Sequence, residues 1–193
     1  MTYIKKAESE KMTDQDKEIL QRLKSPIKRE AAYRELLKTY GPRLYWHIRR
    51  IVVSHDDAED VMQDTAIKIF NGIETFRGES SLLTWLYRIA TNESLAHLRR
   101  RCTLFQSVDS LGESLAEKVE SEADIDAERA TVLFQQAVAK LPTQQRLAFN
   151  MRYYDELSYS QMSEITGKNI NTLKTNYHFA AESVKKYIKE NAI

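Results

Sequence analysis

The sequence predicts an all-α protein of two small helical domains joined by an acidic linker, with a helix-turn-helix in the second domain. The 193 residues include only 5 Gly and 3 Pro, too few for the many turns of a β-sandwich or barrel. Apolar residues instead recur at helical spacing through most of the chain. Charge is also divided, because residues 104–128 hold one Lys against eight Asp and Glu. That stretch carries −7 and the rest +8, of a total of +1.

We interpret residues 104–127 as a solvated linker, because acidic and small polar side chains dominate there and large apolar ones are few. The two domains then span residues 13–103 and 128–190. An acidic surface helix within a single domain is the alternative interpretation.

Composition limits the class of protein. A single Cys excludes a disulfide framework and multi-cysteine zinc sites, and it fits a reducing cytosol. The first residues lack the apolar core of a signal peptide, and there is no run of about 18 apolar residues to cross a membrane. We therefore expect a soluble cytoplasmic protein without membrane insertion. The near-neutral charge argues against tight binding of nucleic acid by the chain alone.

The first domain is expected to be helical throughout. Thr13 or Asp14 caps a helix over residues 13–24, which ends at Ser25-Pro26. Two helices follow, over residues 29–40 and 43–53, because Gly41-Pro42 is expected to stop the first of them. Acidic residues then favour a helix start at 56, and its apolar stripe extends to residue 73. A long helix covers residues 82–102.

The helix over residues 56–73 has an unusual outer face. Opposite its apolar stripe, the helical wheel places Asp60, Gln63, Asp64 and Ile67. A single exposed Ile is common and needs no explanation. An Ile ringed by polar groups is also typical of the apolar centre of a protein-binding patch, so both interpretations stay open.

A second group of residues fits contact with unpaired nucleic acid. The loop after residue 73 contains Phe76, Arg77 and Gly78, and the following helix contains Trp85 and Tyr87. Aromatic side chains interleaved with arginine are typical of surfaces that stack on unpaired bases. In the alternative, Trp85 packs in the core, and Arg99, Arg100 and Arg101 interact with the dipole at the helix end.

The second domain has a helix-turn-helix pattern. Helices are expected over residues 129–140 and from Pro142-Thr143, followed by a short helix that Ser158 and Gln161 begin as a capping box and Gly167 ends. Asn169 caps the last helix. The outer face of that helix carries Asn171, Thr175, His178 and Phe179, with Lys174 on its flank, and such side chains can contact base edges and phosphates. An ordinary helical hairpin packed on its own partner helix is the alternative.

These segments resemble regions 2 and 4 of extracytoplasmic-function (ECF) sigma factors of the sigma-70 family. Residues 40–45 (YGPRLY), 57–64 (DAEDVMQD), 76–80 (FRGES) and 84–92 (TWLYRIATN) look like region 2. Leu141-Pro142, Arg152-Tyr153, Leu157-Ser158-Tyr159 and residues 167–175 (GKNINTLKT) look like region 4. The resemblance extends from about residue 18 to 189, in the order and spacing of the family.

The resemblance implies a bacterial initiation factor that binds core RNA polymerase and directs it to promoter DNA. It assigns Asp60, Gln63, Asp64 and Ile67 to the polymerase interface. It assigns to recognition and melting of the −10 element the residues Phe76, Arg77, Gly78, Glu79, Ser80, Trp85, Tyr87, Arg88 and Asn92. It assigns to the −35 element the residues Asn171, Thr172, Lys174, Thr175, His178 and Phe179. An anti-sigma factor is a common partner in this family, and neither a cofactor, a metal nor a catalytic residue is implied.

Three positions depart from the family pattern. Many relatives have Ala where this chain has Ser163, a change between small residues that leaves the helix-turn-helix interpretation intact. Many also have Gly where this chain has Asn171, and Arg where it has Phe179. The −35 sequence that this chain reads therefore cannot be taken from a relative.

Two rival functions account for fewer of these residues. A metal-dependent phosphohydrolase could begin with His55-Asp56, but the other histidines lack metal-ligand spacing to this pair, and no nucleotide-binding or hydrolase motif is present. A conventional helix-turn-helix regulator, acting without core polymerase, leaves residues 76–92 and the outer face of the helix at 56–73 without a role.

Overall fold

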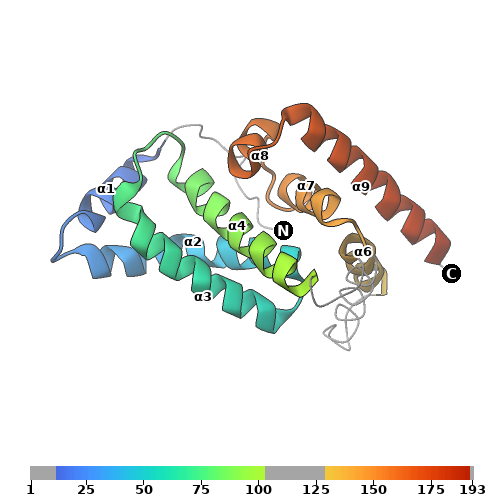
Figure 1. The fold of residues 1–193 in the computed structure, drawn as a ribbon, viewed down its shortest axis with the longest axis horizontal. Coiled ribbons are helices and arrows are strands. Elements are labelled where there is room, and N and C mark those ends of the chain that lie inside the picture. The colour runs from blue at the N-terminus through green and yellow to red at the C-terminus, as the bar shows by residue number, and fades with distance from the viewer. Residues whose placement is uncertain (1–11, 103–128, 192–193) are drawn as a thin grey trace.

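The computed structural model describes residues 12–102 and 129–191, and this part of the chain folds into helices with no strand (Figure 1). The first domain contains α1 (Asp14–Leu23), α2 (Arg29–Val52), α3 (His55–Gly72), the 3-10 turn η1 (Ile73–Thr75) and α4 (Leu82–Cys102). The second contains α6 (Arg129–Ala139), α7 (Thr143–Tyr153), α8 (Tyr159–Thr166) and α9 (Ile170–Asn191). The all-α expectation is confirmed. The expected acidic linker, 104–127, lies outside the described residues.

None of the helices in the described ranges has the length and apolar character that spanning a bilayer requires.

The second helix differs from the expectation. Instead of ending at Gly41-Pro42, α2 continues without interruption through Pro42, so the predicted break between residues 40 and 43 was wrong. Pro42 removes one backbone hydrogen bond, but Gly41 has no Cβ to collide with the proline ring, which is the usual reason that the preceding residue leaves the helical region. Leu36 and Leu44 are both fully buried in one core, so packing on both sides of Pro42 holds the helix together.

The helix ends follow local sequence signals. Thr13 and Asp16 form a reciprocal capping box at α1, with both hydrogen bonds 3.1 Å long. Ser158 and Gln161 form another at α8, with hydrogen bonds of 2.9 and 3.2 Å. Gly167 ends α8 with φ +68°, in the left-handed region where a glycine costs least. The capping box of α8 and its end at Gly167 were predicted from the sequence and are confirmed. Of the two residues predicted to cap α1, Thr13 and Asp14, the cap is Thr13.

A tight turn joins α2 to α3. Val53 has φ +71°, and the amide of Ser54 donates to the carbonyl of Val52 at 2.9 Å, which makes a γ-turn centred on a β-branched residue. Ser54 then caps α3 by accepting a hydrogen bond from the amide of Asp57 at 3.4 Å. The turn sends α3 back along α2, and α4 packs against both.

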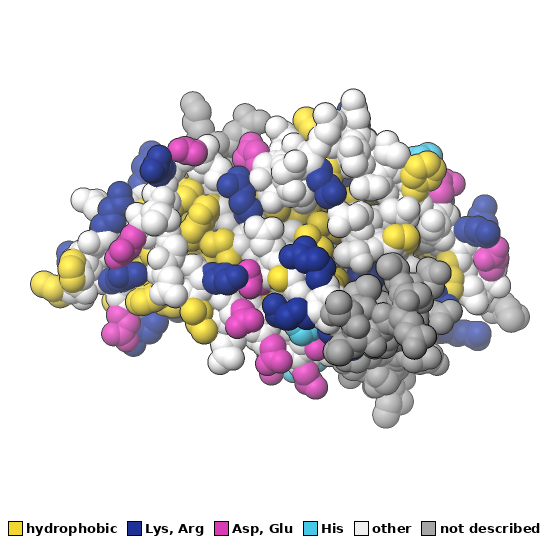
Figure 2. All heavy atoms as spheres, in the orientation of Figure 1, with side chains coloured by type: hydrophobic (Ala, Val, Ile, Leu, Met, Phe, Trp, Pro, Cys, Tyr) yellow, Lys and Arg dark blue, Asp and Glu magenta, His cyan; other side chains and the backbone are white. Residues whose placement is uncertain are grey.

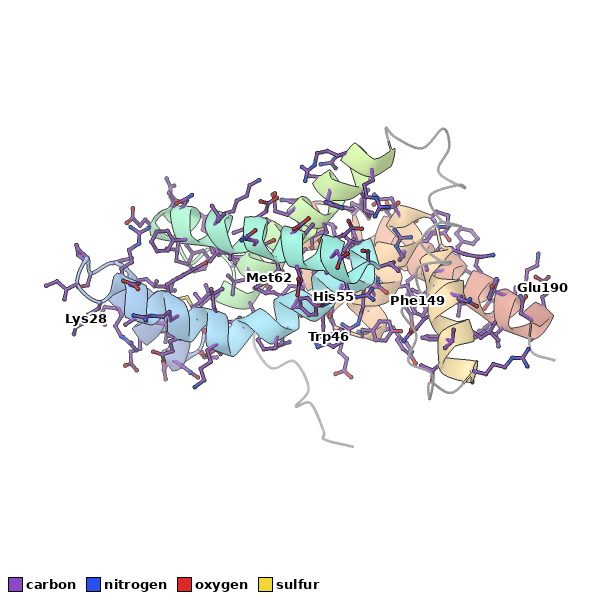
Figure 3. The ribbon with its side chains drawn as sticks, turned by 90° about the horizontal axis from the view of Figure 1, so that it is seen from below. Lys28, Trp46, His55, Met62, Phe149 and Glu190 are labelled. Atoms are coloured by element: carbon purple, nitrogen blue, oxygen red, sulfur yellow. The ribbon has the colours of Figure 1, made fainter. Side chains whose placement is uncertain are left out.

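The two domains lie against each other. α8 packs on α4 and α7 packs on α2, so the helix-turn-helix sits beside the long helix of the first domain (Figure 1). A single apolar cluster runs across the junction, joining Leu86 and Ala90 of α4 to Met151, Met162 and Ile165 of the second domain. A smaller cluster, centred on Phe149, Ala180 and Val184, holds α6 and α7 against the outer part of α9. Seen from below, Trp46 of α2 and Phe149 lie on opposite sides of this junction (Figure 3).

Candidate protein and nucleic-acid interfaces

The outer face of α3 is a solvent-exposed patch with an apolar centre. As the helical wheel predicts, Asp60, Gln63, Asp64 and Ile67 are all exposed, with 56% of the Ile67 surface accessible. The opposite side of the helix is buried through Ala58, Val61, Thr65 and Ile69. Acidic side chains gather over the lower end of α3 in the space-filling view (Figure 2). We refer to these four exposed residues as the α3 patch.

The start of α3 is anchored to the end of α4. Asp57 pairs with His97, with Oδ1 and Nε2 3.2 Å apart, and its other carboxylate oxygen accepts from Arg101. The partly buried carboxylate of Asp57 is therefore occupied in holding the two helices together, whereas the α3 patch lies farther along the helix.

The loop that precedes α4 presents a small exposed tip. Arg77, Gly78 and Glu79 are exposed, and Gly78 has φ +75°, which a side chain would strain. Ser81 caps α4, since its hydroxyl accepts from the amide of Thr84 at 3.1 Å. The loop is thus fixed at its base and open at its tip.

Two aromatic residues pack between this loop and the core of the first domain. Phe76 packs against Trp85, with ring centroids 5.3 Å apart, and both are partly buried against the core. Trp85 also fills the space beside Gly72, where an added Cβ would lie 3.4 Å from the indole ring. Trp85 therefore packs as a core residue in this conformation, which is the alternative that the sequence left open.

Tyr87 is not exposed in this conformation. Only 1% of its surface is accessible, and its ring packs on that of His47 with centroids 4.6 Å apart. Burial, together with the nearby carboxylate of Asp155, raises the pKa of Tyr87, although the Arg43 guanidinium opposes the shift. Tyr87 cannot stack on a base in this conformation, contrary to what its interleaving with arginine indicated.

Two further residues of α4 have different surroundings. Arg88 donates to the backbone carbonyl of Glu164 in α8 at 3.1 Å, so it is engaged by the second domain. Asn92, one turn farther along, is exposed. The residues predicted to act together on unpaired DNA therefore lie in three different surroundings. The loop tip and Asn92 are exposed, and Phe76 and Trp85 pack on each other under the loop. Tyr87 and Arg88 lie at the domain junction.

The outer face of α9 is free of the core along its first three turns. The predicted positions Asn171, Thr172, Lys174, Thr175, His178 and Phe179 are all exposed, and Phe179 keeps 53% of its surface accessible. Asn169 caps the helix by accepting from the amide of Asn171 at 2.8 Å. The ammonium group of Lys174 lies over the ring of Tyr159, 5.8 Å from its centroid. An apolar ring of this size on an exposed helix face is suited to contact with a partner.

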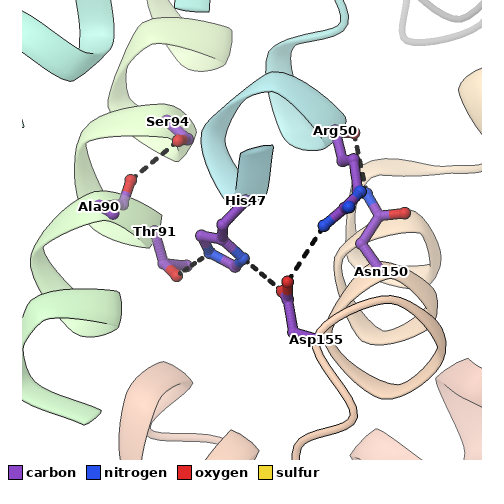
Figure 4. A network of polar contacts seen from close by, with 7 residues as sticks. All are labelled: His47, Arg50, Ala90, Thr91, Ser94, Asn150 and Asp155. Atoms are coloured by element: carbon purple, nitrogen blue, oxygen red, sulfur yellow. Dashed lines mark hydrogen bonds and ion pairs between the residues drawn. The ribbon is translucent and has the colours of Figure 1, made fainter. Parts of the chain in front are cut away.

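A buried polar network at the domain junction was missed by sequence reasoning (Figure 4). His47 is fully buried, and its Nδ1 lies 2.6 Å from Oδ2 of Asp155, which follows α7. Its Nε2 lies 2.9 Å from Oγ1 of Thr91 in α4. Arg50 pairs with the other oxygen of Asp155 at 3.2 Å, and the backbone carbonyl of Arg50 accepts from the side-chain Nδ2 of Asn150 at 2.8 Å. One sequence signal was available, because His47 interrupts the apolar stripe of α2 between Leu44 and Ile51.

Two family models match the chain on both sides of the undescribed segment. Sigma-70 region 2 matches residues 36–102, and Sigma-70, region 4 matches residues 131–184. The ECF RNA polymerase sigma factor SigW of Bacillus subtilis is 26% identical over 168 residues, covering 82% of this chain and 90% of that protein. The ECF RNA polymerase sigma-E factor of Haemophilus influenzae is 29% identical over 191 residues, covering 94% and 98%. The chain is an ECF sigma factor of the sigma-70 family.

Solved structures share the fold of this sigma factor. RpoE of Bartonella quintana, in complex with the anti-sigma factor NepR, aligns with a TM-score of 0.64 and 22% identity, covering 82% of this chain and 98% of that one. CnrH, in complex with the cytosolic domain of CnrY, aligns with a TM-score of 0.67 and 17% identity, covering 92% and 99%. The alignments extend over both domains, so the two-domain helical fold is common to all three proteins.

The histidine of the rival phosphohydrolase pattern has other contacts in this sigma factor. His55 lies 2.7 Å from the hydroxyl of Tyr45 and 3.3 Å from Glu59, on the surface of α3. Across residues 12–102 and 129–191, no three His, Cys, Asp or Glu side chains gather as a metal ion would require.

Proposed function

We propose that this ECF sigma factor binds core RNA polymerase through its first domain, residues 13–103, and directs it to promoter DNA. In this role the polymerase catalyses RNA synthesis. The sigma factor contacts the polymerase and the promoter and needs no catalytic residue, metal or cofactor of its own. The second domain, residues 128–190, reads the −35 element through α9. The observation that carries the proposal is the alignment of six polar, basic and aromatic side chains along one exposed face of α9, directly after the turn at Gly167.

The chemistry of this face suits a major groove. Asn171 and Thr175 can exchange hydrogen bonds with base edges, and Lys174 can pair with a phosphate. Phe179 can meet the methyl group of a thymine, the contact for which an exposed aromatic ring on a recognition helix is well suited. Because Asn171 and Phe179 are the departures from the family pattern that lie on this face, they are the positions that we expect to give this sigma factor its own −35 preference.

The loop at 76–80 and helix α4 act on the −10 element. The exposed tip at Arg77, Gly78 and Glu79 approaches the strand, and the left-handed backbone at Gly78 lets it come close without a side chain in the way. The packing of Phe76 on Trp85 holds the base of this loop against the core. Asn92 contacts the same strand farther along α4, and Tyr87 and Arg88 join when the second domain moves away.

The α3 patch is the polymerase-binding surface. Ile67 supplies an apolar anchor, and Asp60, Gln63 and Asp64 surround it with groups that pair with cations and amides on the partner. The carboxylates of this patch also repel the phosphates of DNA, which the same domain binds through other residues.

The sigma factor works in the cytoplasm, where the polymerase and the promoter are found. Two proteins of the same fold form complexes, one with the anti-sigma factor NepR and the other with the cytosolic domain of CnrY. We infer that an anti-sigma factor is a third partner of this chain as well.

Co-elution and footprinting test this assignment. The full chain is mixed with its own core polymerase, separated by size exclusion, and used to footprint random-fragment duplex DNA. We expect a stable complex that protects two DNA segments about two helical turns apart, whereas the chain alone protects none at the same concentration. Protection of a single operator by the chain alone, without binding to polymerase, would favour the conventional regulator.

A further inference from the structure

Arg29, at the start of α2, stabilises the C-terminal end of α3. Its Nη2 donates to the backbone carbonyl of Phe70 at 2.9 Å, and its guanidinium lies over the Phe70 ring, 4.4 Å from the centroid. α3 has no basic residue in its own last turn, where helix carbonyls lack helical partners and a positive charge is favourable. Arg29 therefore supplies, from another helix, the charge that the end of α3 lacks.

The same guanidinium also reaches η1. Its Nη1 donates to Oε1 of Glu74 at 2.5 Å, and Glu74 stands two positions before Phe76, where the loop at 76–80 begins. An exposed ion pair on its own contributes little. Here one planar group contacts a carboxylate, a carbonyl and an aromatic ring together, which a lysine ammonium cannot do. Arg29 therefore joins the end of α3 to η1 in one defined geometry.

Tyr33, one turn farther along α2, gives this contact a firm base. Its hydroxyl donates to the carbonyl of Ala66 at 2.5 Å, and its ring meets Phe70 edge-on, with centroids 5.0 Å apart. Arg29 and Tyr33 share one face of α2, as residues four apart do, and both contact Phe70. The last turns of α3 are therefore fixed on α2, so Arg29 holds η1 against a part of the domain that is itself anchored.

η1 depends on contacts of this kind for its position. It is a single 3-10 turn, which has poorer hydrogen-bond geometry than an α-helix. On one side, Trp85 of α4 lies beside Gly72 and packs on Phe76. On the other side, Arg29 holds Glu74. The direction in which the loop leaves η1 is therefore set between Trp85 and Arg29.

The tip of the loop has a support of its own. A Cβ on Gly78 would lie 3.9 Å from Cε of Met12, which precedes the cap of α1 and is partly buried against the core. α1 also contacts η1, and it lies beside the connection from α3 to α4 (Figure 1). Met12 and Arg29 both precede residues 36–102, the segment that matches Sigma-70 region 2. Residues before the matched segment therefore support the loop at two points, its base and its tip.

We propose that Arg29 is a positioning residue for recognition of the −10 element, because through Glu74 it sets where the tip of the loop at 76–80 meets the DNA strand. The proposal deepens the proposed function and rests on it for the role of this loop. Arg29 acts through its neighbours, since its side chain is turned to α3 and η1 and only 25% of it is exposed. Its loss changes which bases the tip accepts, because a displacement of about 1 Å in a recognition group can cost about 100-fold in activity.

Base selectivity in transcription tests this role. The full chain and its core polymerase transcribe a promoter that the wild-type complex has selected from random-sequence duplex DNA, and copies of it with single-base changes in the −10 element. The ratio of the two yields measures selectivity and is independent of the fraction of active sigma factor. We expect Arg29→Gln to lower this ratio by about fivefold or more. A merely structural role would lower both yields and leave the ratio unchanged.

The matched control is Arg34→Gln. Arg34 lies on the same helix with 72% of its side chain exposed, and it pairs with Glu30 at 3.5 Å. We expect the wild-type ratio for this variant. Glu74→Gln should lower the ratio as Arg29→Gln does, and the double variant should fall no further than Arg29→Gln, because the two side chains act as one unit.

Glu74→Gln also separates positioning from folding. If Arg29→Gln loses helical circular dichroism, Glu74→Gln decides alone, because the Glu74 side chain is 58% exposed and its change removes only the ion pair. A folded variant of either residue that keeps the wild-type ratio, additive losses in the double variant, or an equal fall in Arg34→Gln would overturn the proposal. Failure of the proposed function would show differently, as a wild-type complex with no preference for any −10 sequence.

Discussion

His47 in α2 and Asp155 after α7 are 108 positions apart in the sequence, yet Nδ1 of one lies 2.6 Å from Oδ2 of the other inside the domain junction. A carboxylate can only accept, so the histidine donates through Nδ1 and turns Nε2 toward Thr91. The pair links α2 of the first domain to the segment that follows α7 in the second domain. The relative position of the two domains is thus set by a specific contact as well as by apolar packing.

Replacing Ile67 by Asp should weaken binding to core polymerase by about tenfold or more, because a charge replaces the apolar centre of the α3 patch. Stability should change by less than about 0.5 kcal/mol, since the side chain is exposed. Surface plasmon resonance with immobilised polymerase measures the affinity. Ile27→Asp is the control, because Ile27 is 94% exposed in the turn before α2 and outside the patch. Equal losses in both variants would remove the assignment.

Substitutions on α9 should separate affinity from base preference. Lys174→Ala should weaken binding of the polymerase complex to all promoters alike and reduce the salt dependence by about one counterion. Thr175→Ala and Phe179→Ala should instead change which −35 bases are preferred, as selection from a randomised −35 library would report. Lys186→Ala, an exposed lysine farther along α9, is the control and should do neither. Uniform weakening by all three variants would contradict the base-reading roles.

The continuous helix through Pro42 makes a prediction about residues 41 and 42. Pro42→Ala should stabilise the protein by about 1 kcal/mol or more in urea unfolding, because it restores a helical hydrogen bond. Gly41→Ala should destabilise the protein beside Pro42, where the new Cβ meets the proline ring. In the Pro42→Ala background the same change should stabilise it by about 0.5–1 kcal/mol, because its nearest neighbour would be Met62 at 3.9 Å. Two separate helices would instead make Pro42→Ala neutral.

Gly167→Ala tests the turn of the helix-turn-helix. Nothing lies within 4 Å of an added Cβ, so the only penalty is the left-handed backbone at φ +68°. We expect a loss of about 1 kcal/mol in the free energy of unfolding. Gly167→Asn should lose less, because asparagine tolerates this conformation better. An equal loss for both variants would mean that another feature of the turn matters.

Local features were the most predictable from sequence. Three signals act within one or two helical turns: the pair Ser158 and Gln161, the glycine at 167, and the helical spacing of apolar residues in α3. These helix ends and the exposed faces of α3 and α9 could therefore be predicted from the sequence alone. The predicted helix break at Pro42 was wrong because a proline inside a helix costs only a few kcal/mol of stability. Burial of Leu36 and Leu44 in a common core stabilises the continuous helix by more than this cost.

Contacts between distant segments could not be predicted. Tyr87 looked like a nucleic-acid contact because its neighbours are aromatic and basic, but its ring is buried against His47, 40 residues earlier in the chain. Asp155 had no signal of its own, since an acidic residue after a helix usually lies in solvent. The junction depends on how the two domains pack, which helical periodicity does not specify.

Transcription start-site mapping tests the central claim most directly. Core polymerase from the same cell is incubated with genomic DNA and nucleotides, with and without the full chain, and the 5′ ends of the transcripts are sequenced. The account predicts a set of new start sites that require the chain, share sequences near −35 and −10, and disappear with Ile67→Asp but persist with Ile27→Asp. Unchanged start sites in the presence of folded, wild-type chain would contradict it.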